Sequence, residues 1–555
     1  MQSSAQKAEE LKSRGNEAFK AQDYTLAVRC YTEALQHDPN NHLLYSNRSM
    51  CLFKLGKYFL SSNDADHCLR LQPAFRKGFF RKAQALLGMN SPNQAYKYLL
   101  IALNNLSSSS SSASSLEEKK SIAVERRQIL QEIQRAIHLK NRKMKAEGRG
   151  EGVRIVFFEE HNKGQGLVAE RDFSAGEVIF EDTPLVAARY EPLVETKDSV
   201  CCAHCFRSLV PLRVVKKQLK QAGNKDPLQG AEAYFEYQRN AVRCAECDTE
   251  LYCCEQCQTT AWDQYHSELC TRKQEDHPVN QLYQRAKEVS TPDEPHLYIV
   301  RLTARLVATQ ICRLKHFLSS SSEEDVSSDK SPVDELCDPF RAFSSPSIPT
   351  VYHDKPELLR FFCNKLEEAL GPSRPYLRSS SSLDSSSLKA AAKLSFLFTP
   401  RAFEQMFVQY SMNSAKFIPK TPLESWWKRK SGQRPSPLQL ARKELLLAQK
   451  MEVPEELLGG TSTITTNRRR KDTMSKWPGS CELGGLFEVH AMLNHSRERS
   501  GVNAVVSDRF EEGRIAVVAF RNVAAGEELL IDYLMGVEDP ALRRQLEEDY
   551  LITSS

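Results

Sequence analysis

The strongest constraint on the fold is a period of 34 residues in the first hundred positions. Pro39 and Pro73 stand 34 residues apart. The period also relates Tyr24 to Tyr58, Ala27 to Ser61 and Ala95, and Ala34 to Cys68 and Ala102. Proline cannot continue a helix, and small side chains let two helices approach closely. We therefore expect three stacked helix pairs over residues 7–106. The alternative, a generic helical bundle, would not keep one period at several independent positions.

Five polar residues in these repeats form a pattern that suits a carboxylate ligand: Lys12, Asn16, Asn47, Lys77 and Arg81. A spacing of four residues places Lys12 with Asn16, and Lys77 with Arg81, on one helical face. The first helices of stacked repeats line a concave groove. Charged donors from Lys and Arg, with neutral donors from Asn, would bind a carboxylate there. The alternative is that these are ordinary solvated charges.

The segments LKSRGNEAF, LYSNRSM and FRKGFFRKA that carry these residues resemble the tetratricopeptide repeats of heat-shock co-chaperones. The five residues match that family's carboxylate clamp. The resemblance implies that the arm binds the C-terminal Glu-Glu-Val-Asp tails of the seventy- and ninety-kilodalton heat-shock proteins. Residues 107–150 should then be a serine-rich linker, starting with a run at 107–112, and a helix over 116–147 that caps the last repeat.

Nine of the 16 cysteines lie between Cys201 and Cys270. The chain starts with a polar segment and shows no export signal, so metal binding is favoured over disulfides. Four close pairs supply seven thiols and one imidazole: Cys202 with Cys205, Cys244 with Cys247, Cys253 with Cys257, and His266 with Cys270. Such a set suits two tetrahedral zinc ions with no open position, which is typical of structural sites.

The segment CAECDTELYCCEQCQTTAWDQYHSELC resembles a MYND zinc finger, in which the ligand pairs interleave. The resemblance implies that one ion is held by Cys202, Cys205, Cys253 and Cys257, and the other by Cys244, Cys247, His266 and Cys270. Cys254 is a spare. Cys201 could replace Cys202, and the sequence leaves that choice open.

Three further segments flank this finger: NKGQGLVAERDFSAGEVIFEDTPLVAA before it, and GLFEVHAMLNHS and AAGEELLIDYL after it. In this order they resemble the SET-domain lysine methyltransferases of the SET-and-MYND family, over residues 153–550. The resemblance implies transfer of a methyl group from S-adenosylmethionine to a lysine of a protein substrate. Tyr533 would orient the amine and the methyl group. The cofactor would meet Gly164, Gly166, Asn413, Asn494, His495 and Tyr533. Each of these has a structural alternative when taken singly, such as a turn or a core aromatic.

The pattern departs from the family at one motif. The family has Asn-His-Ser-Cys, two residues and then Asn, whereas here Arg497 replaces the cysteine and the next asparagine is Asn503. No cysteine follows Cys481, so we expect two zinc ions and no third, post-SET zinc site. This departure keeps open a catalytically weak or inactive scaffold or co-chaperone adaptor. A zinc-finger regulator that binds nucleic acid is a further alternative.

The expected fold class is multidomain α+β: a helical repeat solenoid, then a β-rich SET domain split by a two-zinc finger and a helical insertion. Expected limits are 7–106 for the repeats, 107–150 for linker and cap, 152–200 and 481–537 for the SET parts, 201–270 for the finger, 271–480 for the insertion and 538–555 for the tail. Net charge of +5 and mean hydropathy of −0.50 give no strong nucleic-acid signal and no membrane span. We expect a cytoplasmic protein, and nuclear too if the basic run at 467–471 is an import signal rather than a solvated loop.

Overall fold

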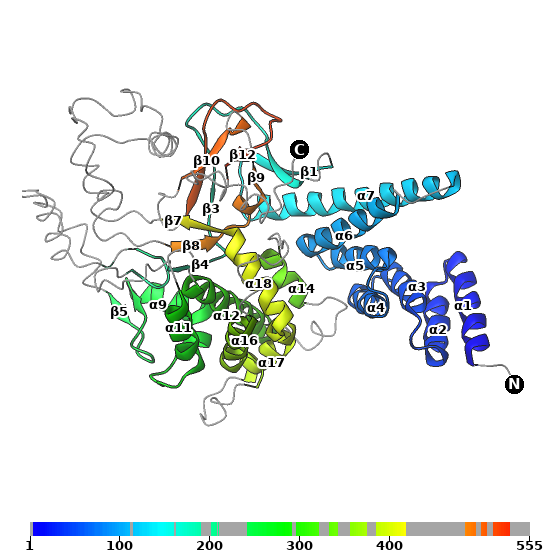
Figure 1. Ribbon diagram of the computed structural model, residues 1–555, viewed down its shortest axis with the longest axis horizontal. Helices are drawn as coiled ribbons and strands as arrows, with labels where there is room; N and C mark the ends of the chain where they lie inside the picture. The colour runs from blue at the N-terminus through cyan, green and yellow to red at the C-terminus, as the bar shows by residue number, and fades with distance from the viewer. Residues whose placement is uncertain are drawn as a thin grey trace, which may run out of the picture. The chain divides into compact units, whose positions relative to one another are not determined.

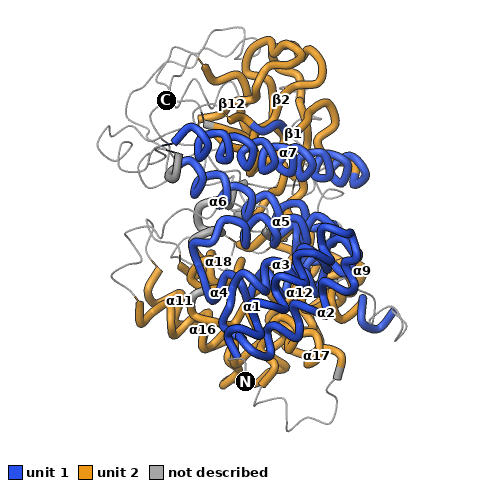
Figure 2. Tube along the Cα trace, turned by 90° about the vertical axis from the view of Figure 1, so that its right-hand side faces the viewer, with its two compact units in different colours: residues 1–147, 155–157, 317–342 blue, residues 148–154, 158–316, 343–555 orange. Residues whose placement is uncertain are grey.

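The computed structural model describes residues 4–110, 115–159, 163–189, 201–207, 209, 241–290, 296–320, 332–341, 356–373, 385–417, 483–495, 501–507 and 514–532. The chain divides into two compact units (Figure 2). Unit 1 contains residues 1–147, 155–157 and 317–342, and unit 2 contains residues 148–154, 158–316 and 343–555. Each unit is described separately below.

Unit 1 begins with six helices that pack pairwise along the chain, drawn blue to cyan in Figure 1. They are α1 (Ser4–Lys20), α2 (Tyr24–His37), α3 (His42–Lys54), α4 (Tyr58–Leu71), α5 (Arg76–Gly88) and α6 (Pro92–Ser110), followed by α7 (Leu116–Ala146), which packs on α6. The small residues of the 34-residue period are all fully buried: Ala27, Ala34, Ser61, Cys68, Ala95 and Ala102. The predicted close packing of paired helices is therefore confirmed.

The prediction that the serine run after the third repeat is a linker is wrong for its first residues, which are helical. Helix α6 continues through it to Ser110. The hydroxyl of Ser107 donates a hydrogen bond to the carbonyl oxygen of Leu103 at 3.2 Å, one turn earlier. A serine whose hydroxyl bonds back to the preceding turn fits within a helix, so composition alone placed the helix end too early.

A segment far along the chain completes unit 1. It consists of α14 (Pro332–Cys337) and a 3-10 turn, η4 (Asp338–Arg341). The fully buried Asp338 carboxylate accepts backbone hydrogen bonds from Asn93 at 3.3 Å and Gln94 at 3.0 Å, in the first turn of α6. A carboxylate at this position satisfies free N–H groups of the helix and opposes its dipole. The segment thus caps the third repeat.

Unit 2 contains several short strands: β2 (Gly164–Ala169), β3 (Val178–Asp182), β4 (Val186–Arg189), β5 (Val242–Arg243), β6 (Leu251–Tyr252), β7 (Ser414–Phe417), β8 (Leu483–Leu486), β9 (Asn494–His495), β10 (Ala504–Ser507), β11 (Ile515–Ala519) and β12 (Leu530–Ile531). Two antiparallel sheets have the orders β10-β11-β3 and β4-β8-β7. Strands β5 and β6 pair antiparallel, whereas β9 and β12 pair in parallel. Strand β1 (Val153–Phe158) is divided between the two units.

Strand β11 is the centre of its sheet, and its sequence shows why. Every residue from Ile515 to Ala519 is buried, as expected for an apolar run without polar alternation. β11 pairs with β10 on one side and with β3 on the other, where a register shift falls between Val517 and Val518. Strands β10, β11 and β12 thus lie in the β-rich SET part expected over residues 481–537.

Helices make up the rest of unit 2: α9 (Glu255–Ala261), the π-helical turn η3 (Trp262–His266), α10 (Ser267–Leu269), α11 (Pro278–Val289), α12 (His296–Ser320, whose last residues belong to unit 1), α16 (Pro356–Leu370), α17 (Ser385–Lys393), η6 (Ser395–Phe398), α18 (Pro400–Asn413) and η8 (His490–Met492). The insertion expected to be helical over residues 271–480 contains α11, α12 and α16. Within the described residues, no helix is both long and apolar enough to cross a membrane.

Candidate functional site

The two parts of the chain on either side of the cysteine block fold into one core. Strand β3, from before the block, pairs with β11, from after it, and β4 pairs likewise with β8. Val168 and Glu528 form a further antiparallel bridge between the two parts. The cysteine block is thus an insertion within one folded body.

A polar cluster lies where these two parts meet. The side-chain amide of Asn494 donates to Glu528 Oε1 at 2.8 Å, and Lys163 Nζ lies 3.0 Å from Glu528 Oε2. A Cβ atom built on Gly166 would collide with Asn494 Nδ2 and lie 2.9 Å from Phe158 Cε2, so a larger residue here would displace these side chains. Gly164 has a φ of +74°, which also favours glycine. Two of the predicted cofactor residues, Gly166 and Asn494, are therefore neighbours.

Asn503 fixes the strand that faces Asn494. Its side chain is 1% exposed and donates to Glu527 Oε1 at 2.9 Å and to the backbone oxygen of Glu528 at 2.8 Å. Its Oδ1 accepts the backbone N–H of Leu530 at 2.8 Å. Because Leu530 is opposite Asn494 in the parallel β12–β9 pair, Asn503 holds the strand that borders the polar cluster.

The structure describes only part of the other residues predicted to contact the cofactor. His495 follows Asn494 in β9, where its backbone is in register with Ile531, and Asn413 ends α18. The side chains of both lie outside the described residues, as do Tyr533 and Arg497 altogether.

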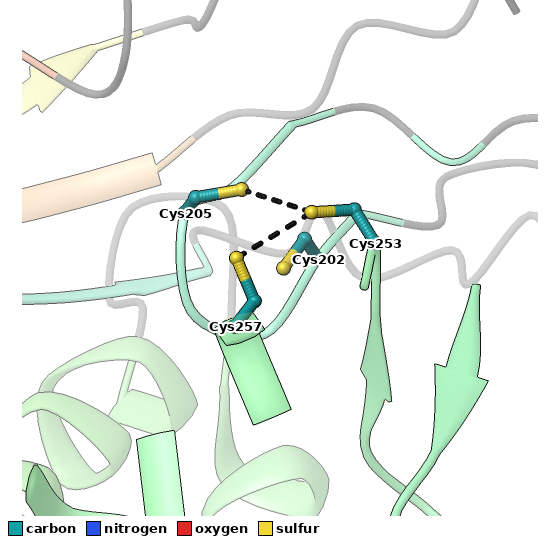
Figure 3. Close-up of side chains that lie close together, drawn as sticks. All are labelled: Cys202, Cys205, Cys253 and Cys257. Carbon is teal, nitrogen blue, oxygen red and sulfur yellow. Dashed lines mark hydrogen bonds between the residues drawn. The ribbon is translucent and has the colours of Figure 1, made fainter. Parts of the chain in front are cut away.

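The eight predicted metal ligands gather in two groups of four, and within each group all ligand atoms lie within 4.8 Å of one another. Figure 3 shows the four sulfurs of the first group turned toward one another. The first group contains Cys202, Cys205, Cys253 and Cys257, and the second contains Cys244, Cys247, His266 and Cys270. These are the interleaved sets that the finger resemblance implied.

The spacing of the ligand atoms suits zinc. A tetrahedral zinc ion with Zn–S bonds of about 2.3 Å requires sulfurs about 3.8 Å apart. The separations are 3.6 Å for Cys205–Cys253, 3.5 Å for Cys253–Cys257, 3.9 Å for Cys244–Cys270 and 3.5 Å from Cys247 Sγ to His266 Nε2. The donor set and its geometry therefore fit one zinc ion in each group.

One thiol in each group favours its anionic form, which is the form that binds metal. The pKa of Cys202 is lowered because the thiols of Cys205 and Cys253 donate hydrogen bonds to its sulfur. The pKa of Cys247 is lowered chiefly by a hydrogen bond from Cys270. In each group, hydrogen bonds from neighbouring thiols therefore favour the metal-binding form of one cysteine.

Cys201 has a different environment from its neighbour Cys202. It is fully buried in a hydrophobic cluster with Ala187, Phe206 and Phe487, among others. It is not a member of either ligand group. The structure thus distinguishes the two adjacent cysteines that the sequence left open.

The five residues of the predicted carboxylate clamp lie on α1, α3 and α5, the first helices of the three pairs. Asn16 and Asn47 are adjacent, with Asn47 Nδ2 3.4 Å from Asn16 Oδ1. The hydroxyl of Tyr31 donates to the same oxygen at 2.8 Å. Lys12 forms an exposed ion pair with Glu9 at 2.6 Å.

Arg81 and Lys77 have no carboxylate partner among the described residues, whereas Arg48 on α3 has one. Arg48 pairs with Asp64 through two bonds of 2.7 Å. Arg81 instead donates from Nη1 to Gln84 at 3.1 Å, and its buried Nε has no partner among the described residues. Burial lowers the pKa of Arg81 to about 10. An anionic ligand would form charge-assisted hydrogen bonds with this desolvated guanidinium and so offset the free-energy cost of burying its charge.

Comparison with known protein families shows which family this chain belongs to. The sequence matches the SET domain over residues 164–534 and the tetratricopeptide repeat over residues 8–41. The first match covers more than half of the 555 residues, so the chain belongs to the SET domain family. This class comprises protein methyltransferases in general, and here it is joined to tetratricopeptide repeats.

The repeat arm is similar in sequence to several curated proteins. The chain is 42% identical over 97 residues to Protein STIP1 homolog of Dictyostelium discoideum, covering 18% of this chain and 17% of that protein. It is 41% identical over 88 residues to Hsp70-Hsp90 organizing protein 3 of Arabidopsis thaliana, covering 16% of each. The solved TPR2B-domain:pHsp70-complex of yeast Sti1 is 28% identical, with 23% of this chain and 95% of that chain covered and a TM-score of 0.21. The matched region is less than a fifth of either curated relative.

Sequence reasoning missed Glu528, which contacts Asn494 and Lys163. It lies in the segment AAGEELLIDYL, beside Glu527. The two glutamates are equivalent in the sequence pattern. Only the bridge between Val168 and Glu528 shows which of them borders the cluster.

Proposed function

We propose that this chain is a protein-lysine N-methyltransferase that uses S-adenosylmethionine. The observation that carries this proposal is the meeting of Gly166, Asn494 and Glu528 in a SET domain whose two parts pair across the cysteine block. The SET domain indicates methyltransferase chemistry, and the choice of lysine follows the resemblance to SET-and-MYND enzymes.

The polar cluster fits one end of this cofactor. The amino-acid end of S-adenosylmethionine carries an ammonium and a carboxylate. The cluster offers a carboxylate on Glu528, an amide on Asn494 and an ammonium on Lys163. These groups match both charges of such a zwitterion. Gly164 and Gly166 would let the backbone approach the cofactor, and we propose the same neighbourhood for Asn413 and His495.

S-adenosylmethionine supplies an electrophilic methyl group on a sulfonium. A lysine amine has an ordinary pKa near ~10.4, so the protein must bind it in its neutral form. Its nitrogen lone pair then forms the new C–N bond, while the broken C–S bond leaves its electrons on sulfur. We assign Tyr533 the orientation of this amine, and assign the rest of the rate to positioning and exclusion of water.

The test is incubation of the full chain with a labelled methyl donor and a cell extract. Wild type should label protein lysine, and Tyr533→Phe should reduce the rate by about tenfold or more, because one orienting hydrogen bond is lost. An unchanged rate in that variant would remove Tyr533 from its role. No labelling by wild type would count against the enzyme.

The second candidate is a catalytically weak or inactive SET scaffold that serves as a co-chaperone adaptor. The observation that favours it is Arg497, which replaces the cysteine expected after Asn-His-Ser. Titration calorimetry separates the two, since an enzyme must bind S-adenosylmethionine whereas a scaffold need not. A wild-type protein that binds the cofactor but labels no lysine would favour the scaffold.

We further propose that the cysteine block is a two-zinc MYND finger and that the protein belongs to the SET-and-MYND subfamily, near SET and MYND domain-containing protein 5. The two ligand groups support the zinc ions. We propose a cytoplasmic location, with nuclear entry through the run at 467–471, which lies outside the described residues. The domain limits expected from the sequence accompany this proposal, except that α6 runs to Ser110 and residues 317–342 belong to unit 1.

For the repeat arm we propose binding of the C-terminal tails of Hsp70 and Hsp90 chaperones. The relative named Hsp70-Hsp90 organizing protein 3 supports this function, as does Arg81, which has no carboxylate partner among the described residues. Arg81→Ala or Lys77→Ala should weaken binding of a peptide ending in Glu-Glu-Val-Asp by about tenfold or more, because charge-assisted hydrogen bonds are lost.

A matched control for this experiment is Arg70→Ala, which removes an exposed arginine from α4, a second helix. It should leave the peptide affinity unchanged. A peptide with an amidated C-terminus should bind weakly to all proteins. Equal affinity of wild type and both clamp variants for the free-carboxylate peptide would contradict the proposed arm function.

A further inference from the structure

Asp182 connects the part of the SET core before the cysteine block to the turn that leads to Asn494. It is the last residue of β3 and is 2% exposed. Its Oδ2 accepts backbone hydrogen bonds from Val489 and His490, both at 2.9 Å. These N–H groups start the turn η8, and Asn494 follows at the beginning of β9. One carboxylate oxygen therefore fixes the start of the turn.

The surroundings of Asp182 show how unusual this carboxylate is. Its Oδ1 has no hydrogen-bond partner within the described part of the chain. The charged and titratable groups around it are Arg149, Glu488 and His490, and Arg149 is paired with Glu488 at 3.0 Å. Burial raises the pKa of Asp182 to about 7, against the stabilising effect of the two backbone N–H groups. A buried carboxylate without a cation in contact is costly to fold.

The far end of the same segment is held by different contacts. Asn494 is fixed by the Glu528 carboxylate and by the register of β9 with β12. Residues 489–494 are thus held at one end by Asp182 and at the other by Glu528. Loss of either contact would free the backbone that places the Asn494 amide.

We propose that Asp182 is a positioning residue for cofactor binding: it accepts the backbone N–H groups of Val489 and His490 and so sets the place of Asn494. This inference rests on the proposed methyltransferase function. Asp182 touches neither the reacting atoms nor Asn494, and acts through the turn between them. Its loss should therefore affect cofactor affinity more than the chemical step.

The test compares three variants by calorimetry with S-adenosylmethionine and by steady-state kinetics. Asp182→Ala should raise the Kd and the KM for the cofactor by about tenfold, with a smaller change in kcat, because two charge-assisted hydrogen bonds are lost. Asp182→Asn keeps an acceptor oxygen and should stay within about threefold of wild type. Glu181→Ala, on the same strand, should have no effect, because Glu181 is exposed and pairs with the exposed Arg514 at 3.0 Å.

A second variant keeps the proposal testable if Asp182→Ala does not fold. Val489→Pro removes one donor and keeps the carboxylate, and the φ of −74° at Val489 suits proline. It should raise the cofactor Kd by about threefold or more. Equal Kd values in wild type, Asp182→Ala and Val489→Pro would overturn the positioning role alone. A wild-type protein that binds no cofactor would overturn the proposed function, and this role with it.

Discussion

Gly15 shows how one residue in the repeat arm supports a predicted binding residue. A Cβ atom at this position would lie 2.6 Å from Cε1 of Tyr31, whose hydroxyl holds Asn16. The sequence motif LKSRGNEAF contains this glycine, but its pattern does not show which ring packs against it. The need for glycine here comes from a tertiary contact rather than from backbone conformation.

We predict that Gly15→Ala destabilises unit 1 by about 1–3 kcal/mol, because an extra methyl group must displace a well-packed ring. Thermal unfolding followed by circular dichroism measures this change. Ser13→Ala, at an exposed position of the same helix, is the matched control and should stay within about 0.5 kcal/mol. A variant at position 15 as stable as the control would show that Tyr31 moves aside freely.

Sequence spacing predicts which candidate metal ligands form close pairs, but it does not predict which pairs share an ion. Short spacings identify pairs such as Cys244 with Cys247, because a tight turn brings such cysteines together. Which pair shares an ion with which depends on β5, β6 and the helix after them, so the grouping came from family resemblance. The choice between Cys201 and Cys202 had no local signal, since it depends on packing against Phe487, nearly 300 residues away.

We predict that Cys202→Ser halves the zinc content of the purified protein, because one ligand group loses a thiolate that the ion requires. Cys201→Ser should keep both ions, since Cys201 lies in an apolar cluster. Elemental analysis by mass spectrometry gives zinc per chain for both variants. Loss of zinc from the Cys201 variant alone would reverse this assignment.

At the scale of elements, helices were easier to predict than sheets. The composition of residues 116–147 predicts α7, and the insertion expected to be helical over 271–480 contains α11, α12 and α16. The pairing of β3 with β11 joins strands more than 300 residues apart, and it follows from the closed core rather than from either segment alone. The serine run failed as a helix-end signal because its first hydroxyl bonds within the helix.

The docked segment of α14 and η4 should make unit 1 sensitive to pH through Asp338. Burial raises the pKa of Asp338 to about 6, against the favourable effect of Lys143 and the two backbone N–H groups. The folded state therefore binds the proton more tightly than the unfolded state, and stability is lost as pH rises through this value. Lowering the pH from 7 to 5 should stabilise wild type by about 1 kcal/mol relative to Asp338→Asn.

Chemical denaturation of both proteins at the two pH values measures this difference, because effects of other titrating groups cancel in the comparison. The variant retains an oxygen that can accept from the first turn of α6. An equal pH dependence in the two proteins would show that Asp338 does not titrate in this range.

At the scale of the whole molecule, each unit contains a hydrophobic cluster of its own residues, and both candidate zinc sites belong to unit 2. We predict that removal of zinc by a chelator unfolds the cysteine block and weakens S-adenosylmethionine binding, because structural zinc supplies folding free energy. Affinity for a Glu-Glu-Val-Asp peptide should stay within about twofold, since the clamp residues lie in unit 1. Calorimetry with both ligands before and after chelation tests this. A parallel loss of peptide affinity would show that the two functions depend on one another.

Unit 1 is assembled from three separate stretches of chain, and this limits how the arm can be inherited or engineered. A fragment that stops at residue 147 keeps every repeat but loses Asp338, so two backbone amides at the start of α6 would have to turn to solvent. A gene fusion that transferred only the repeats would carry an arm with an unprotected end. The repeat arm of this protein therefore cannot be transferred by its N-terminal sequence alone. The segment that caps it is encoded almost two hundred codons downstream, within the region that encodes unit 2.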